Sequence, residues 1–348
     1  MIFYLPLCVG FSTLRSIKID LFREGWDDML KKNVKEQFKR LDLPVIVAPM
    51  FLVSSIELVV EGCKSGVVTT FPLLNARTSE ELEEWMQAIT IQLAEAQKTT
   101  SKVAPWGVNL IVHKSNDRYE ADIKLIKKYQ PPVVITSLGK PTDIIKIVHE
   151  YGGLVFSDVI SILHAKKATE AGIDGLILVC NGAGGHGGTL HPMAFVHEVK
   201  QFFDGMVILS GAITQGQDIL AAQVIGADFA YMGTRFIATK ESLANKAYKK
   251  MLLEAQAGDI IYTDKLSGVH ANFLLKSILN AGLDPATLEK PKQLEILHKA
   301  EGETNAWKDI WSAGHGVGGI HEILPVAELV ERLKAEYYES IQKVVEKQ

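Results

Sequence analysis

A glycine-rich segment with a central histidine is the first feature of the sequence that could do chemistry. Residues 182–188, GAGGHGG, hold five glycines and His186 directly after an apolar run. Glycines let the backbone lie close to a ligand because they carry no Cβ. A histidine in such a loop can exchange a proton near neutral pH. The segment therefore predicts a ligand-binding loop in which His186 is a candidate general base, rather than a structural histidine bonded to a carbonyl.

Two other interpretations of this loop are weaker. The letters of the dinucleotide-binding fingerprint occur at 182–187, but residues 189–192 intervene before a helix can start, and Asp204 lies in a polar turn rather than at a strand end. A metal site is not expected either. His191 and His197 are irregularly spaced from the loop histidine and have no carboxylate partner at ligand spacing.

The elements that must position this loop are eight apolar, β-branched runs that alternate with amphipathic helical stretches. Such alternation predicts parallel strands joined by crossover helices, and continuous apolar strands indicate burial on both faces. Eight repeats favour an α/β fold of the (β/α)₈ TIM-barrel type over a doubly wound sheet with a helical second domain. The expected strands are Pro44–Met50, Val67–Phe71, Gly107–Val112, Val133–Ser137, Leu154–Asp158, Gly175–Cys180, Val207–Gly211 and Phe229–Gly233.

The chain is expected to divide into an N-terminal extension, residues 1–40, packed on the outside, and a barrel over residues 41–348. A helical segment at about 240–320 would be inserted before a final helix that docks on the barrel. This insertion could fold over the mouth of the barrel, which makes His270 a secondary candidate for substrate contact.

Reacting groups of such barrels collect at the carboxyl ends of the strands. Ser137 and Asp158 end two of the runs but receive no role at this stage. Gly211 and the pair Gly233-Thr234 follow the last two runs, where backbone N–H groups can bind a phosphate.

One cysteine and two further histidines are not expected to take part in catalysis. Cys180 is expected to be inert packing, because nothing near it in the sequence activates a thiol. His149 and His164 lie on or near helices and are expected to be solvated.

Composition narrows the classes of partner. The formal net charge is −4 and the pI is near 6.2, which gives no basic field for nucleic acid. The apolar start of the chain is too short for a membrane span. Three separated cysteines suit a reducing cytoplasm. The expected partners are a small-molecule substrate and a second copy of the chain in a homo-oligomer.

The segments LPVIVAPMFLVSS, WGVNLIVH, GAGGHGG and LSGAITQGQDILAAQVIGADFAYMGTRF together resemble the nitronate monooxygenase (2-nitropropane dioxygenase) family. The resemblance covers about Leu43 to Phe236 in order and register. It implies an FMN-dependent TIM barrel that oxidises alkyl nitronates, and by extension nitroalkanes, with O₂ to a carbonyl compound and nitrite.

The resemblance also implies roles for individual residues. His186 would remove the α-proton of a neutral nitroalkane. Pro49 and Met50 would lie along the flavin ring, and Asn109 would bind its pyrimidine side. The glycines Gly184 and Gly185 would lie near the ribityl chain or the ring edge. The FMN phosphate would be held by Gly211, Ala212, Met232, Gly233 and Thr234.

The chain departs from the family pattern at two positions. Val179 stands where many members have a glutamine that contacts the flavin, and Ala212 replaces a common glycine. Other functions remain open: an FMN-dependent NAD(P)H reductase of the enoyl-reductase type, a flavin-binding protein without turnover, and a phosphate-binding isomerase barrel without flavin.

Overall fold

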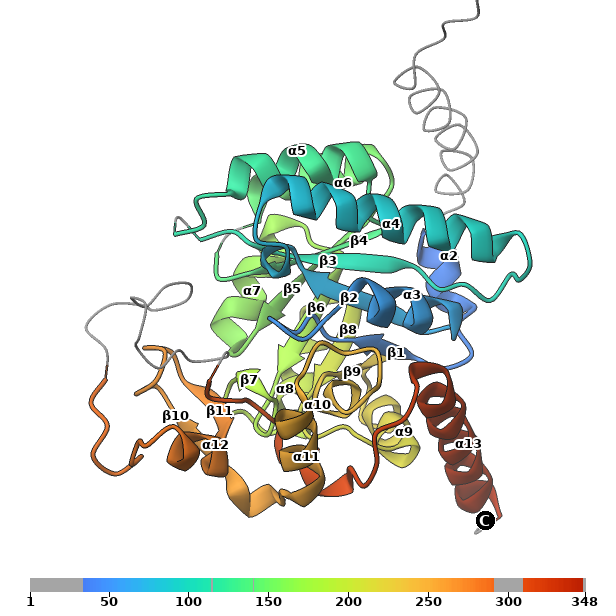
Figure 1. The fold of residues 1–348 in the computed structure, drawn as a ribbon. Coiled ribbons are helices and arrows are strands. Elements are labelled where there is room, and N and C mark those ends of the chain that lie inside the picture. Colours follow the sequence, from blue (N-terminus) through green and yellow to red (C-terminus); the bar gives the residue numbers. More distant parts are fainter. Residues whose placement is uncertain (1–33, 114, 140, 291–308, 347–348) are drawn as a thin grey trace, which may run out of the picture.

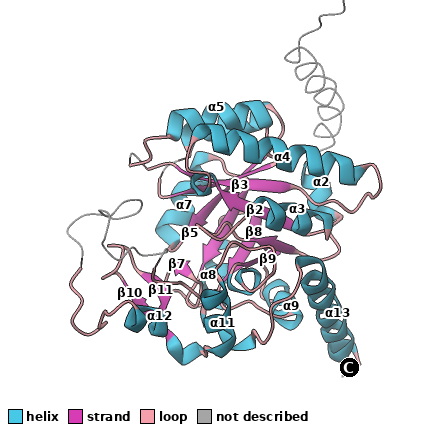
Figure 2. Cartoon of the chain, in the orientation of Figure 1, coloured by secondary structure: helices cyan, strands magenta, loops and turns pink. Residues whose placement is uncertain are grey.

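A closed barrel of eight parallel strands forms the centre of the protein (Figures 1 and 2). The computed structural model describes residues 34–113, 115–139, 141–290 and 309–346. The strand order is β1-β2-β3-β4-β5-β6-β8-β9, and β9 pairs back with β1. The predicted barrel is therefore confirmed over the open sheet. Its strands are β1 (Val45–Val47), β2 (Val68–Pro72), β3 (Trp106–Ile111), β4 (Val133–Ser137), β5 (Leu154–Val159), β6 (Gly175–Val179), β8 (Met206–Ser210) and β9 (Phe229–Met232).

Amphipathic helices cover the outside of the barrel and alternate with its strands (Figure 1). Local signals in the sequence set their ends. The Thr78 side chain accepts a hydrogen bond from the Glu81 amide at the start of α4, and Gly172 ends α7 with a φ of 89°. The helices are α3 (Ile56–Lys64), α4 (Ser79–Gln97), α5 (Tyr119–Tyr129), α6 (Thr142–Glu150), α7 (Ile162–Ala171), α8 (Pro192–Val199) and α9 (Gly216–Val224).

Each barrel strand is buried on both faces. In β5, Leu154 and Phe156 belong to the apolar cluster inside the barrel. Val155 and Val159 belong to the larger cluster between the strands and the helices. This two-sided burial, with side chains alternating along the strand, is why the strands read as continuous apolar runs.

The last residues of the expected N-terminal extension close one end of the barrel. Helix α2 (Val34–Lys39) buries Val34 and Phe38 in the cluster inside the barrel. The ring of Phe38 packs edge-on against Phe156, at 5.8 Å between centroids, and against Phe229, at 5.2 Å. Residues 1–33 lie outside the described residues. For residues 34–39, the expectation of packing on the outside is wrong, because two apolar side chains four positions apart on one helix face fill the barrel end.

The insertion after β9 contains a small sheet as well as helices. It comprises α10 (Thr234–Ile237), α11 (Lys246–Glu254), β10 (Ile260–Thr263), β11 (Ala271–Leu274), α12 (Leu275–Asn280) and a 3₁₀ turn at His315–Gly319. Strands β10 and β11 pair antiparallel, and β11 also pairs with β7 (Gly185–His186). The sequence predicted helices and loops here. It missed the two strands because each has four residues and the partner of β11 lies in a distant loop. Residues 291–308 lie outside the described residues.

The final helix, α13 (Val326–Val345), packs against α3 and α9 and completes the ring of helices, as expected from the sequence. Its contact with α9 is close. The Gly216 amide donates to Glu336 Oε2 at 2.8 Å, and a Cβ at Gly216 would lie 2.3 Å from the Tyr337 nitrogen. Glycine is therefore the residue that fits at the start of α9.

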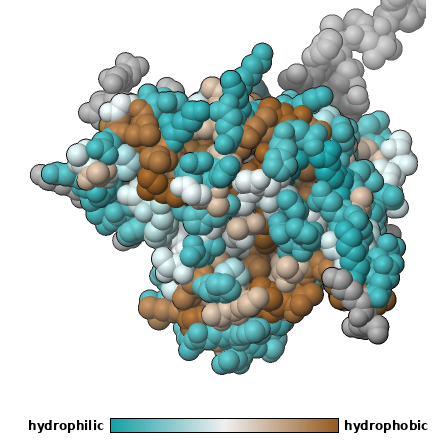
Figure 3. Space-filling model, turned by 90° about the horizontal axis from the view of Figure 1, so that it is seen from below, coloured by the Kyte–Doolittle hydropathy of each residue, from teal (hydrophilic) through white to brown (hydrophobic). Residues whose placement is uncertain are grey.

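The surface seen from below the view of Figure 1 carries apolar patches separated by polar side chains (Figure 3). The homo-oligomer stays a prediction.

We predict that Phe38→Ala lowers the free energy of unfolding by about 3–5 kcal/mol, because it empties a site between two buried rings. Urea unfolding followed by circular dichroism measures the change. Lys39→Ala, an exposed position on the same helix, is the matched control and should shift stability by less than about 0.5 kcal/mol. Equal effects of the two changes would show that α2 does not help to hold the barrel together.

Candidate active site

The inner face of the barrel changes from apolar to polar at the carboxyl ends of the strands. In β4 the inward residues Val133 and Ile135 are followed by Ser137, and in β5 Phe156 is followed by Asp158. The same change gives a polar upper layer on five strands, formed by Asn109, Ser137, Asp158, Ser210 and Tyr231. All five residues line one cavity of about 1350 Å³. This end of the barrel is therefore built to meet a polar ligand.

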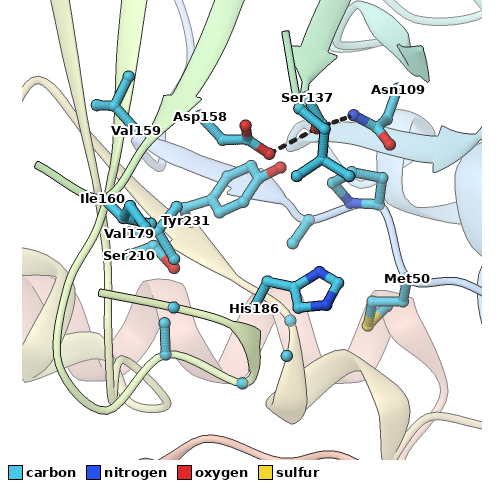
Figure 4. A pocket seen from close by; sticks show the side chains of 18 of the residues that line it. Met50, Asn109, Ser137, Asp158, Val159, Ile160, Val179, His186, Ser210 and Tyr231 are labelled. Atoms are coloured by element: carbon cyan, nitrogen blue, oxygen red, sulfur yellow. Dashed lines mark hydrogen bonds between the residues drawn. The ribbon is translucent and has the colours of Figure 1, made fainter. Parts of the chain in front are cut away.

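Three of these polar side chains form a hydrogen-bonded chain across neighbouring strands. The Asn109 amide nitrogen Nδ2 donates to Ser137 Oγ at 2.6 Å, and also to the carbonyl oxygen of Ile135 at 3.3 Å. Ser137 Oγ donates in turn to Asp158 Oδ2 at 2.6 Å. Figure 4 shows the chain running along one side of the cavity. The carboxylate of Asp158 is the last acceptor of this hydrogen-bonded chain.

Burial controls the ionisation of this cluster. It raises the pKa of Asp158 from 3.8 to about 6, although the hydrogen bond from Ser137 lowers it. Burial also raises the pKa of the Tyr231 phenol well above its usual value, and the nearby negative charge of Asp158 raises it further. At neutral pH the cluster thus holds a carboxylate that loses its charge in mild acid, next to a phenol that stays protonated.

His186 points into the same cavity from the opposite side, where the glycine-rich loop crosses the barrel mouth (Figure 4). Burial lowers the pKa of its imidazole from 6.5 to about 4. The ring is therefore neutral at pH 7 and able to accept a proton.

The insertion holds the glycine-rich loop in place. His186 is paired with Ala271 and Gly185 with Asn272, through β7 and β11. The Asn272 side chain donates to the Ala183 carbonyl at 2.7 Å. Ser312 Oγ accepts from the Gly185 amide and donates to the Asn272 carbonyl, both at 2.6 Å. The position of the imidazole is thus fixed by backbone pairing to a distant segment.

The two turns predicted to bind phosphate lie next to each other at the same cavity. Gly211 has a φ of 142° and Ala212 a φ of 54°, a backbone path that favours small residues. Gly233 and Thr234 line the cavity beside them. A segment of the insertion completes the wall, since the Gly314 amide donates to Thr234 Oγ1 at 2.9 Å.

All but one of the residues predicted for the site line this cavity. His186, Pro49, Met50, Asn109, Gly184, Gly185, Gly211, Ala212, Gly233 and Thr234 do so. Met232 does not. Its side chain is buried between the strands and the helices, because Tyr231, one position earlier, faces inward. Val179, the departure from the family pattern, also lines the cavity and leaves β6 without a polar group in the upper layer.

The other candidate residues take different positions. His270 lies at the cavity, with its ring stacked on Tyr262 at 5.0 Å, and Tyr262 Oη donates to the Gly187 carbonyl at 2.8 Å. His164 is exposed on α7, as expected. His149 is also exposed, as expected, and its Nε2 lies 2.8 Å from Asp174 Oδ2.

Cysteine and metal chemistry find no support among the residues that the structure describes. Cys180 is buried, and burial raises the pKa of its thiol to about 12, which keeps it protonated. Within the described ranges, no three histidine, cysteine or carboxylate side chains are grouped to hold a metal ion.

Sequence reasoning missed part of the site. Ser137 and Asp158 were recognised as strand ends, and the period-two alternation along their strands could have identified both as inward-facing. Tyr231 could have been found in the same way. Ser312 and Gly314 carried no such signal, because they reach the site only through the folding of the insertion.

An eight-stranded parallel barrel with a polar cavity at the carboxyl ends of its strands is the architecture of the (β/α)₈-barrel enzymes. Within that class, residues 69–336 match the family model described as nitronate monooxygenase, and the chain belongs to this family, whose members are oxidoreductases. A nitronate monooxygenase of Paraburkholderia phytofirmans is 26% identical over 87% of this chain and 94% of its own length. The family assignment implies a flavin cofactor.

Two solved structures share the fold. FabK from Thermotoga maritima aligns with a TM-score of 0.70 and 23% identity, covering 90% of this chain and 98% of its own. A nitroalkane oxidase from Streptomyces ansochromogenes aligns with a TM-score of 0.69 and 21% identity, covering 88% and 99%. Among the residues described here, no helix has the length and apolar character needed to span a membrane.

We predict that Asp158→Asn stabilises the flavin-free protein at pH 7.5 by roughly 1–3 kcal/mol. The folded protein keeps the Asp158 proton up to about pH 6, whereas the unfolded chain releases it near 3.8, so this carboxyl lowers stability as the pH rises through that window. The gain should vanish as the pH approaches 4. Urea unfolding at several pH values tests this, with Asp143→Asn, an exposed carboxyl on α6, as the control. A gain that does not depend on pH would contradict it.

Proposed function

We propose that this chain binds FMN and oxidises alkyl nitronates with O₂ to a carbonyl compound and nitrite, and that it also accepts neutral nitroalkanes. The family assignment supports the reaction class. The observation that carries the proposal is the neutral imidazole of His186, which faces the same cavity as the two glycine turns suited to a phosphate.

The residues present fit a flavin mononucleotide. The cavity is large enough for a tricyclic ring with a phosphate tail. At one end, the turns at Gly211 and Gly233-Thr234 offer backbone N–H groups at close approach, whereas the Ala212 amide donates to the Gly182 carbonyl at 3.3 Å. Pro49 and Met50 give a wall for a flat ring, with the Met50 side chain beside Gly233. Asn109 can accept a hydrogen bond from the ring edge.

When bound, the flavin supplies the redox chemistry. The proposed reaction adds one oxygen atom to the nitronate carbon and releases nitrite. Two nitronates and one O₂ therefore give two carbonyl products and two nitrite ions. The protein's part is to orient the substrate carbon, exclude bulk water and move one proton. With a neutral nitroalkane, His186 takes the α-proton. With a nitronate that proton is already absent.

We expect the protein to release FMN on denaturation and to produce nitrite from propionate-3-nitronate or ethyl nitronate with consumption of O₂. Mass spectrometry of the released compound identifies the cofactor, and an oxygen electrode with nitrite analysis follows turnover. Free FMN at the same concentration is the control. Nitrite formation no faster than with free FMN would refute the proposed activity.

The same preparation tests the alternative reductase. If NAD(P)H bleaches the bound flavin rapidly without oxygen, while nitronate does not, the chain is an FMN-dependent reductase. A flavin that neither reactant reduces would indicate a binding protein without turnover.

His186→Ala should keep the flavin but lower the rate on neutral nitroethane by roughly 10²–10⁴-fold, the usual contribution of a positioned base. Turnover of pre-formed ethyl nitronate should fall much less. The matched control is His197→Ala, an exposed histidine on α8. Because the pKa of His186 is about 4, the acid limb of kcat/KM that this group causes should lie near pH 4 rather than 6.5. An equal loss on both substrates would contradict the role of His186 as the base.

A further inference from the structure

The hydrogen-bonded chain on the cavity wall fixes which atom Asn109 can offer to a ligand. An asparagine amide has two N–H donors and one carbonyl acceptor. Both donors of Asn109 are directed at protein oxygens, Ser137 Oγ and the Ile135 carbonyl. The carbonyl oxygen Oδ1 is the group that remains for a ligand. In this orientation Asn109 offers a ligand only the acceptor Oδ1, and it therefore selects a ligand with an N–H donor at this point.

The direction of the chain is set at its far end. Ser137 Oγ accepts from Asn109, so its single hydrogen goes to Asp158 Oδ2. An ionised carboxylate has no hydrogen to return. Every hydrogen in the chain therefore points from Asn109 toward Asp158, and the amide cannot rotate by 180° without breaking the chain.

We propose that Asp158 is a positioning residue, which through Ser137 holds Asn109 as the acceptor for the imide N–H of a bound flavin pyrimidine ring. This inference rests on the proposed binding of FMN. It assigns Asp158 to recognition of the cofactor rather than to proton transfer with the substrate.

The surroundings of Asp158 suit this role. Ser137 from β4 and Tyr231 from β9 face it directly, and His186 faces it across the cavity (Figure 4). The charged or titratable side chains of α7 that line the outer part of the cavity are His164, Lys167 and Glu170. Burial raises the pKa of Asp158, and the hydrogen bond from Ser137 is the main opposing effect, with no cation contributing. A carboxylate held chiefly by one hydroxyl is suited to orienting that hydroxyl.

The test is the dissociation constant of FMN, measured by fluorescence quenching on the flavin-free full-length protein at pH 7.5. Ser137→Ala and Asp158→Ala break the chain and should weaken FMN binding by about tenfold. Asp158→Asn keeps an acceptor oxygen for Ser137 and should stay within about threefold of the unmodified protein. Thr136→Val deletes a buried hydroxyl of β4 that does not line the cavity and is the matched control.

A flavin analogue isolates the hydrogen bond. 3-Deaza-FMN has carbon in place of the imide nitrogen, so it lacks the N–H donor while the ring keeps nearly the same size. The unmodified protein should prefer FMN over this analogue by about tenfold, and Ser137→Ala should reduce the preference to about twofold. A general loss of structure would weaken both ligands alike and leave the preference unchanged.

The pH dependence gives a second readout. Protonation of Asp158 below about pH 6 gives the carboxyl a hydrogen that it can donate to Ser137, so the direction of the chain is no longer fixed. FMN binding should therefore weaken between pH 7.5 and 5.5, by no more than the roughly threefold change allowed for Asp158→Asn. The FMN phosphate titrates in the same range. Asp158→Asn is therefore the reference, because the phosphate titration is common to both proteins and only the additional weakening belongs to Asp158.

The outcomes are separable. If the unmodified protein fails to bind FMN, the proposed function and this inference both fall. If it binds FMN but Ser137→Ala changes neither the affinity nor the preference over 3-deaza-FMN, only the inference falls. It also falls if Asp158→Asn is as weak as a folded Asp158→Ala at pH 7.5. Should Asp158→Ala not fold, the smaller change Ser137→Ala still decides the question.

Discussion

The alternation of side chains along eight parallel strands is the constraint on which the rest of the structure depends. Because the strands close into a ring, one set of alternate residues must fill the interior and the other must contact the helices. Apolar residues occupy the lower interior, where Phe38 closes the end. Polar residues gather inside toward the last inward positions of the strands, where the packed interior stops. The polar wall of the cavity, from Asn109 to Asp158, is a direct result.

The second requirement is that the glycine-rich loop be held across the mouth of this ring. Glycines allow close approach to a ligand, but they also leave a loop without side chains to fix it. The insertion supplies the missing order through backbone pairing at Gly185 and His186 and through the bridge made by Ser312. A Cβ at Gly184 would lie 2.9 Å from the Gly314 nitrogen, so the two segments are in contact along their backbones. The site is thus made jointly by the barrel and by a segment that follows its last strand.

The barrel could be predicted from the sequence because strands buried on both faces leave unmistakable apolar runs. The turns at Gly211 and Gly233 could be predicted to line the cavity because glycines that follow a barrel strand let the backbone turn tightly at its carboxyl end. Met232 was placed in the site through the family resemblance, although the alternation in β9 directs Tyr231 inward instead. Strands β10 and β11 were missed because their pairing depends on a loop far away in the sequence. The function of Asp158 was not apparent because it requires knowing that Asn109 lies two strands away, with Ser137 between them.

The position of α13 in the chain has a consequence for biosynthesis. This helix packs between α9 and α3, yet it is made after the whole insertion, and β1 must wait for β9 before the ring can close. During translation the apolar flanks of α3 and α9 therefore stay uncovered until α13 has left the ribosome. Incomplete chains of this kind expose apolar surface until the last helix is made. We expect chaperones that bind nascent proteins to recognise them.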